Sequence, residues 1–175
     1  MRPSGEEGLT ADPHVWLDPS RLARIAIAVG GALHRRRAAQ EVAGDLGALD
    51  REFRSGLAHC RRHEIVTSHA AFGYLADRYG LDQVALTGLS PEVEPGPRDL
   101  ERLVDEVRRS GASTVFSETL VSSRLADTIA REAGATTAIL DPIEGLTRDE
   151  VDAGEDYVSR MRSNLATLQK ALGCR

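Results

Sequence analysis

Three short apolar runs, each followed directly by a histidine or a carboxylate, constrain the fold of this 175-residue chain most strongly. The runs are residues 64–68, 113–117 and 136–140, and β-branched residues are frequent in them. The residues that follow the runs are His69, Glu118 and Asp141. Two of the runs lead straight into a helical pattern, which is typical of parallel strands in βα units. Because ligands of open α/β sheets bind at the carboxyl ends of the strands, these side chains predict a metal site.

The remaining pattern predicts an α/β lobe with a four-stranded parallel sheet flanked by helices. A further strand is expected at residues 83–87, and helices at 70–79, 98–110, 122–133 and about 155–172. Before the lobe, Asp18 and Pro19 begin one helix, since Asp caps helices well and Pro suits the first helical position. A second, long helix is expected at residues 38–60, with no strand beside it.

Composition excludes several classes of function. The net charge of −5 and the lack of a basic footprint argue against nucleic acid as a partner, and the one basic cluster, residues 34–37, fits a solvated helix end. No stretch approaches the roughly 20 apolar residues of a membrane span, and the polar, acidic first residues do not form a signal peptide. The two cysteines, Cys60 and Cys174, form no CxxC motif; their spacing is compatible with one disulfide or with two buried thiols.

Each candidate ligand also has a simpler structural interpretation. His14 lies in a stiff turn with the sequence DPHVWLDP. Asp141 precedes a proline, as turn-forming aspartates often do, and Glu118 fits a residue that hydrogen-bonds a ligand histidine. Two imidazoles with one carboxylate suit zinc, whereas sets richer in carboxylate suit manganese.

The chain contains no HExxH, GxSxG or nucleotide-binding glycine motif that would indicate an enzyme.

Four motifs together resemble the substrate-binding proteins of zinc and manganese ABC transporters. They are DPHVWLDP at residues 12–19, TSHAAFGY at 67–74, SPEVEP at 90–95 and LDPIEGL at 140–146. The likeness covers residues 12–174 with the motifs in the family order. Members of that family bind one divalent ion between two α/β lobes that a long rigid helix joins, so the resemblance implies that residues 61–175 are the C-terminal lobe of such a metal receptor.

Carried over motif by motif, the resemblance implies that His14, His69 and Asp141 bind the metal, with Glu118 close by as a secondary candidate. A histidine at position 69 is typical of zinc-type members, so Zn²⁺ is expected and Mn²⁺ is the alternative. The resemblance further implies a permease of an ABC transporter as the membrane partner and an extracytoplasmic location, in the periplasm or at the cell surface. We therefore expect a binding protein for zinc uptake and no enzymatic activity.

The chain also departs from the family pattern. Only thirteen residues precede His14, whereas family members have a whole amino-terminal lobe there. We therefore expect residues 1–37 to be the remnant of that lobe and residues 38–60 to be the linker helix. A missing lobe on another chain is one expectation; a remnant that binds no metal, or a small zinc metallohydrolase, is the alternative function.

A disulfide between Cys60 and Cys174 is a further prediction. Cys60 ends the long helix just before the first strand, and Cys174 ends the last helix. A bond between them would fix the last helix to the start of the lobe.

Overall fold

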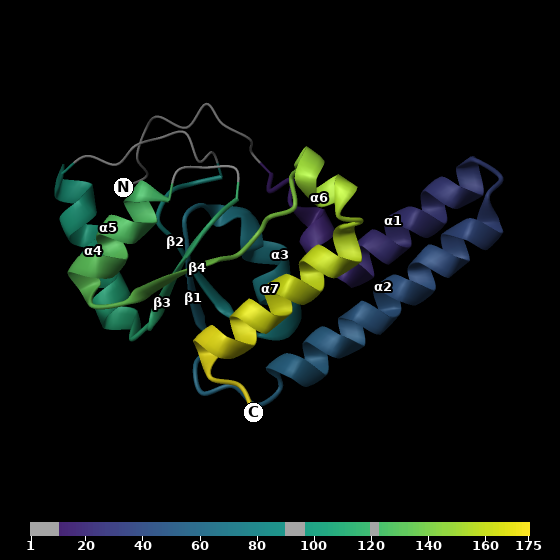
Figure 1. The fold of residues 1–175 in the computed structure, drawn as a ribbon. Helices are drawn as coiled ribbons and strands as arrows, with labels where there is room; N and C mark the ends of the chain where they lie inside the picture. The colour runs from purple at the N-terminus through teal and green to yellow at the C-terminus, as the bar shows by residue number, and fades with distance from the viewer. Residues whose placement is uncertain (1–10, 90–96, 120–122) are drawn as a thin grey trace.

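A computed structural model describes residues 11–89, 97–119 and 123–175, and its centre is a four-stranded parallel sheet (Figure 1). The strands are β1 (Glu64–Thr67), β2 (Asp82–Ala85), β3 (Thr114–Ser117) and β4 (Thr136–Ile139). They lie in the order β2-β1-β3-β4, and every neighbouring pair is parallel. The predicted α/β class is confirmed. All four strands therefore present their carboxyl ends at one edge of the sheet.

Helices cover both faces of this sheet. Successive strand residues point to opposite faces, so neighbours on one strand contact different helices. On β1, Ile65 packs in one apolar cluster with the helices α2 (Arg36–Leu57), α3 (Gly73–Tyr79) and α7 (Tyr157–Leu172). The next residue, Val66, packs in the other cluster with α4 (Pro97–Ser110) and α5 (Arg124–Ala133). The sheet is therefore the middle layer of three. The motif at residues 90–95 lies outside the described residues.

Short helical segments precede some of the longer helices. They are the 3₁₀ turns η1 (Val15–Leu17) and η2 (Ala70–Phe72) and the helix α6 (Arg148–Asp152). Helix α6 was not predicted, although Thr147 and Glu150 form a capping box at its start, a signal that the sequence contains. The predicted helix at residues 70–79 begins as the turn η2 and continues as α3.

Two antiparallel helices, α1 (Pro19–Ala32) and α2, form a hairpin that extends away from the sheet (Figure 1). Asp18 caps α1 by accepting hydrogen bonds from two backbone N–H groups, as predicted. A Cβ atom at Gly30 would collide with Ala39, so glycine is needed where the two helices approach each other. The C-terminal half of α2 packs against the lobe. Its Phe53 is fully buried and stacks on Tyr79, with 5.0 Å between ring centres. The division into residues 1–37, 38–60 and 61–175 stays a prediction.

A polar network fastens α2 to α3. Both carboxylate oxygens of Asp50 accept hydrogen bonds from Arg78, at 2.9 Å each, and Arg54 and the Tyr79 hydroxyl donate to the same carboxylate. Burial alone would raise the pKa of Asp50, but the hydrogen bonds from Arg78 and Arg54 outweigh it and hold this pKa below its ordinary value. The carboxylate therefore stays ionised and fixes α2 against the lobe.

The predicted disulfide is confirmed: Cys60, three residues after α2, is bonded to Cys174, two residues after α7. Within the described ranges, no helix is both long and apolar enough to cross a membrane.

Candidate metal centre

His69 lies at the carboxyl end of β1, the central strand next to β3, and its side chain is completely buried. Its Nδ1 atom lies 2.6 Å from Oε1 of Glu118, the residue that follows β3. The same oxygen accepts a hydrogen bond from the backbone N–H of His69. The backbone carbonyl of His69 accepts from the Thr67 hydroxyl and from Gln83. The strand end therefore fixes both the position and the ring orientation of this histidine.

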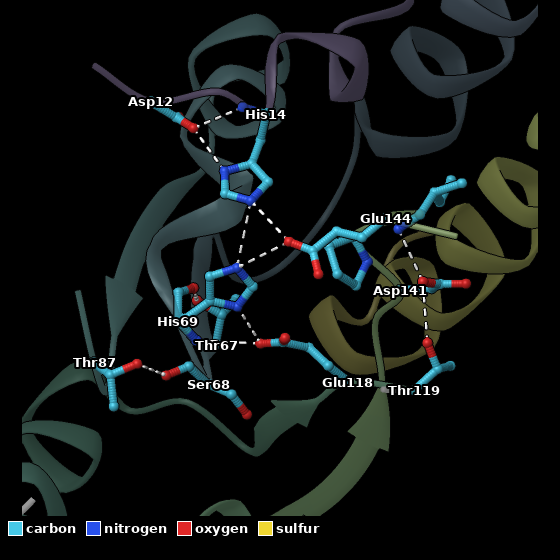
Figure 2. Close-up of polar contacts among 12 residues, drawn as sticks. Asp12, His14, Thr67, Ser68, His69, Thr87, Glu118, Thr119, Asp141 and Glu144 are labelled. Atoms are coloured by element: carbon cyan, nitrogen blue, oxygen red, sulfur yellow. Dashed lines mark hydrogen bonds and ion pairs between the residues drawn. The ribbon is translucent and has the colours of Figure 1, made fainter. Parts of the chain in front are cut away.

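His14 reaches the same place from the segment before η1, and its side chain is also buried. Its Nδ1 atom lies 2.7 Å from Oδ1 of Asp12, which also accepts the backbone N–H of His14. Its Nε2 atom lies 3.5 Å from Nε2 of His69 (Figure 2). Two residues 55 positions apart in the sequence therefore point their outer ring nitrogens at each other.

Glu144, in the loop after β4, completes a triangle with the two histidines (Figure 2). Its Oε1 atom lies 3.2 Å from Nε2 of His14 and 3.9 Å from Nε2 of His69. A circle through three atoms with these separations has a radius of about 2.1 Å, which equals a zinc–nitrogen or zinc–oxygen bond length. An ion at the centre would therefore contact all three atoms at bonding distance.

The hydrogen bonds at Nδ1 determine which ring nitrogen is free. When Asp12 and Glu118 accept the Nδ1 proton of His14 and His69, the neutral rings present an Nε2 lone pair toward the centre. Two such lone pairs and one carboxylate oxygen then converge without a proton between them. Three electron-pair donors that converge in this way are a suitable set for binding a metal cation.

Asp141 takes a different place from the one expected from the sequence. Its carboxylate is buried, and Arg160 on α7 donates to Oδ2 from two nitrogens, at 2.9 and 2.8 Å. Its Oδ1 accepts from the Thr119 hydroxyl and from the backbone N–H of Ile143. The donor cluster that the described residues form is His14, His69 and Glu144, without Asp141. Glu118, the secondary candidate, contacts His69 and is likewise outside this cluster.

Direct contacts join the segment that carries His14 to the loop that carries Glu144. The Trp16 indole N–H donates to the carbonyl of Pro142 at 2.8 Å, and the Tyr157 hydroxyl donates to the carbonyl of Trp16 at 2.6 Å. Burial raises the pKa of Tyr157 well above its ordinary value, so the hydroxyl remains a donor. Residues that follow the last strand in the sequence therefore hold the segment of His14 in place.

Comparison with known proteins identifies the family of this chain. The sequence matches the family of the periplasmic zinc-uptake complex component A, ZnuA, over residues 2–171. The chain belongs to this family. Among curated ZnuA-type relatives, the zinc-binding lipoprotein AdcA of Streptococcus pneumoniae is 38% identical over 95% of this chain and 35% of its own length. The high-affinity zinc uptake system protein ZnuA of Bacillus subtilis is 34% identical over 92% of this chain and 53% of its own length.

Solved structures of similar proteins share the fold. The Zn(II)-bound ZnuA-like domain of S. pneumoniae AdcA superposes with a TM-score of 0.74 at 35% identity, covering 96% of this chain and 68% of that one. The laminin-binding protein Lbp of Streptococcus pyogenes has a TM-score of 0.80 at 33% identity, covering 92% and 65%. The chain thus spans about a third to a half of the curated relatives named above.

Glu144 was not among the site residues predicted from the sequence. It stands in the last of the four motifs, LDPIEGL, four residues from its start, so the motif itself contained the signal. Strand-end placement favoured Asp141, because Asp141 follows the predicted strand directly and Glu144 lies three residues further on.

Proposed function

We propose that this chain binds Zn²⁺ reversibly as cargo, as the metal-binding part of the substrate-binding component of a zinc uptake system. His14, His69 and Glu144 are the proposed ligands. The observation that carries the proposal is the triangle of donor atoms, whose centre lies at about the zinc bond length from each of them.

The donor set favours zinc over manganese. Two neutral imidazoles and a single carboxylate suit Zn²⁺, whereas Mn²⁺ prefers sites richer in carboxylate. Two further carboxylates lie nearby, but Glu118 is occupied by His69 and Asp141 by Arg160. The proposed site therefore offers nitrogen as its majority donor.

Exposure of Glu144 supports capture and release in preference to a permanent structural ion. The side chain of Glu144 is 38% exposed, while those of both histidines are almost fully buried. An ion can therefore exchange past the carboxylate, and a water molecule can fill its fourth coordination position. Because zinc must compete with protons for both imidazoles, binding weakens in mild acid.

We propose the remaining functional assignments from the family. The ZnuA family and its lipoprotein relatives support an extracytoplasmic location, and the disulfide fits an oxidising compartment. The proposed recipient of the ion is an ABC transporter permease. The proposed activity is binding without catalytic turnover.

A zinc titration tests this proposal. Competition with a chromogenic chelator should show one zinc ion per chain for the wild type. His69→Ala should weaken binding by at least about 100-fold, the upper end of the effect of losing a mere supporting group. Glu144→Gln should weaken it less, because the histidines remain. Glu132→Gln, an exposed glutamate on α5, is the matched control and should bind like the wild type.

Three outcomes would contradict the proposal. Equal affinity in the wild type and His69→Ala would exclude this site. An absence of zinc binding by the wild type would favour the non-binding remnant. Turnover of ester or phosphoester substrates that depends on zinc would instead favour the metallohydrolase.

A further inference from the structure

The loop that presents Glu144 to the histidines has an unusual backbone conformation. Ile143, the residue before Glu144, has a φ angle of +55°. A β-branched residue rarely adopts this left-handed conformation, and it persists only where the surrounding structure holds it. Two hydrogen bonds do so. The Ile143 N–H donates to Oδ1 of Asp141 at 2.9 Å, and the carbonyl of Pro142 accepts from the Trp16 indole.

Asp141 is itself immobilised from several directions. Its backbone N–H donates to the side-chain carbonyl of Asn164, and its backbone carbonyl accepts from the Asn164 amide. Its carboxylate accepts from Thr119 on one oxygen and from Arg160 on the other. Arg160 also forms an ion pair with this buried carboxylate, at 2.8 Å. The acceptor that receives the Ile143 N–H is therefore a fixed point of the lobe.

We propose that Asp141 is a positioning residue of the metal site: it accepts the Ile143 N–H and thereby fixes the left-handed turn that directs Glu144 toward His14 and His69. This role rests on the proposed zinc-binding function. Asp141 acts on the ion through the backbone and through Glu144. Without this acceptor, Ile143 relaxes to a negative φ angle, and the Glu144 carboxylate leaves the triangle.

Two variants with matched charge separate positioning from ligation. Asp141→Asn combined with Arg160→Gln keeps an oxygen that can accept the Ile143 N–H and removes one charge of each sign. Asp141→Ala combined with Arg160→Gln removes the acceptor and changes the charge identically. Each is made with Glu144 and with Glu144→Gln, and zinc affinity is measured by chelator competition. Thermal unfolding in the presence of a chelator checks that all four proteins fold.

The expected pattern follows from the hydrogen bond. The asparagine variant should bind zinc within about 3-fold of the wild type. The alanine variant should lose about as much affinity as Glu144→Gln alone, and it should lose little more when Glu144→Gln is added. A residue with a merely structural role would weaken binding equally in both backgrounds.

Other results would overturn this role. Affinity near that of the wild type in both the asparagine and the alanine variants would show that the acceptor is irrelevant. An asparagine variant as weak as the alanine variant would indicate ligation by Asp141. If the alanine variant weakens zinc binding as much in the Glu144→Gln background as with Glu144 present, an action through Glu144 is excluded. Failure of the wild type to bind zinc would remove the proposed function as well, so the two failures are distinguishable.

A substitution in the loop tests the same idea if the alanine variant does not fold. Ile143→Pro cannot reach a positive φ angle and has no N–H to donate, but it leaves Asp141, Arg160 and all three proposed ligands in place. Because Ile143 lies in an irregular loop, the lobe should fold. Ile143→Pro should weaken zinc binding as much as Glu144→Gln does. Wild-type affinity in Ile143→Pro would contradict the proposal.

Discussion

Glu118→Gln and Asp12→Asn form a matched pair of substitutions for the metal site. Each replaces the carboxylate that accepts the Nδ1 proton of one proposed ligand, His69 or His14. Loss of such a supporting group typically weakens metal binding by about 10- to 100-fold. The geometry ranks the two substitutions. Glu118 lies 2.6 Å from its histidine with a side chain only 2% exposed, whereas the Asp12 contact is 2.7 Å and its side chain is 24% exposed.

Solvent screening therefore reduces the effect of Asp12 more than that of Glu118. We expect Glu118→Gln to approach the 100-fold limit, about 2.7 kcal/mol, and Asp12→Asn to lie near 10-fold, about 1.4 kcal/mol. Chelator competition at neutral pH measures both affinities, and thermal unfolding without metal shows whether each variant is folded. Wild-type affinity in folded Glu118→Gln, or a larger loss in Asp12→Asn, would refute the reasoning.

Three further predictions concern stability. Asp50→Asn should lower the free energy of unfolding by about 1.5–3 kcal/mol at pH 7, because it weakens charged hydrogen bonds to Arg78. Since the pKa of Asp50 is lowered in the folded state, this stabilisation is present above the ordinary carboxyl pKa and is lost as the pH falls through the lowered value. Urea unfolding should therefore show a smaller difference in stability between the wild type and Asp50→Asn at pH 3 than at pH 7. Phe53→Ala should cost about 3–5 kcal/mol in the same assay, and a loss under 1 kcal/mol would contradict its place in the core. Replacing both Cys60 and Cys174 by serine should cost about 4–5 kcal/mol in the chain-entropy model for a separation of 114 residues, and an unchanged thermal midpoint would contradict that value.

The sequence predicted the elements more reliably than the contacts between distant side chains. Alternation of β-branched runs and helical patterns located all four strands to within one or two residues. The signal is strongest for the central strands β1 and β3, because strands buried on both faces form continuous apolar runs. It also placed His69 and Glu118 at neighbouring strand ends, where the structure pairs them. These inferences depend only on local pattern and on the common direction of parallel strands.

The role of Asp141 could not be read in the same way. Its position after a strand is equally compatible with a ligand and with a support. The proposed supporting role rests on Arg160, 19 residues later on a helix that packs beside the loop. The turn at Ile143, which carries Glu144 past Asp141, is also invisible in the residue types, since isoleucine disfavours that conformation.

The disulfide also has a topological consequence for metal exchange. The covalent ring closed by Cys60 and Cys174 encloses the positions of His69 and Glu144 but leaves His14 outside. His14 precedes the ring in the chain, and noncovalent contacts hold it at the site, among them those made by Trp16. One side of the site can therefore detach by local opening of the segment before α1 while the ring stays folded. Under this scheme the lifetime of bound zinc depends on that local opening, and a variant can alter the rate of zinc release without altering the stability of the lobe.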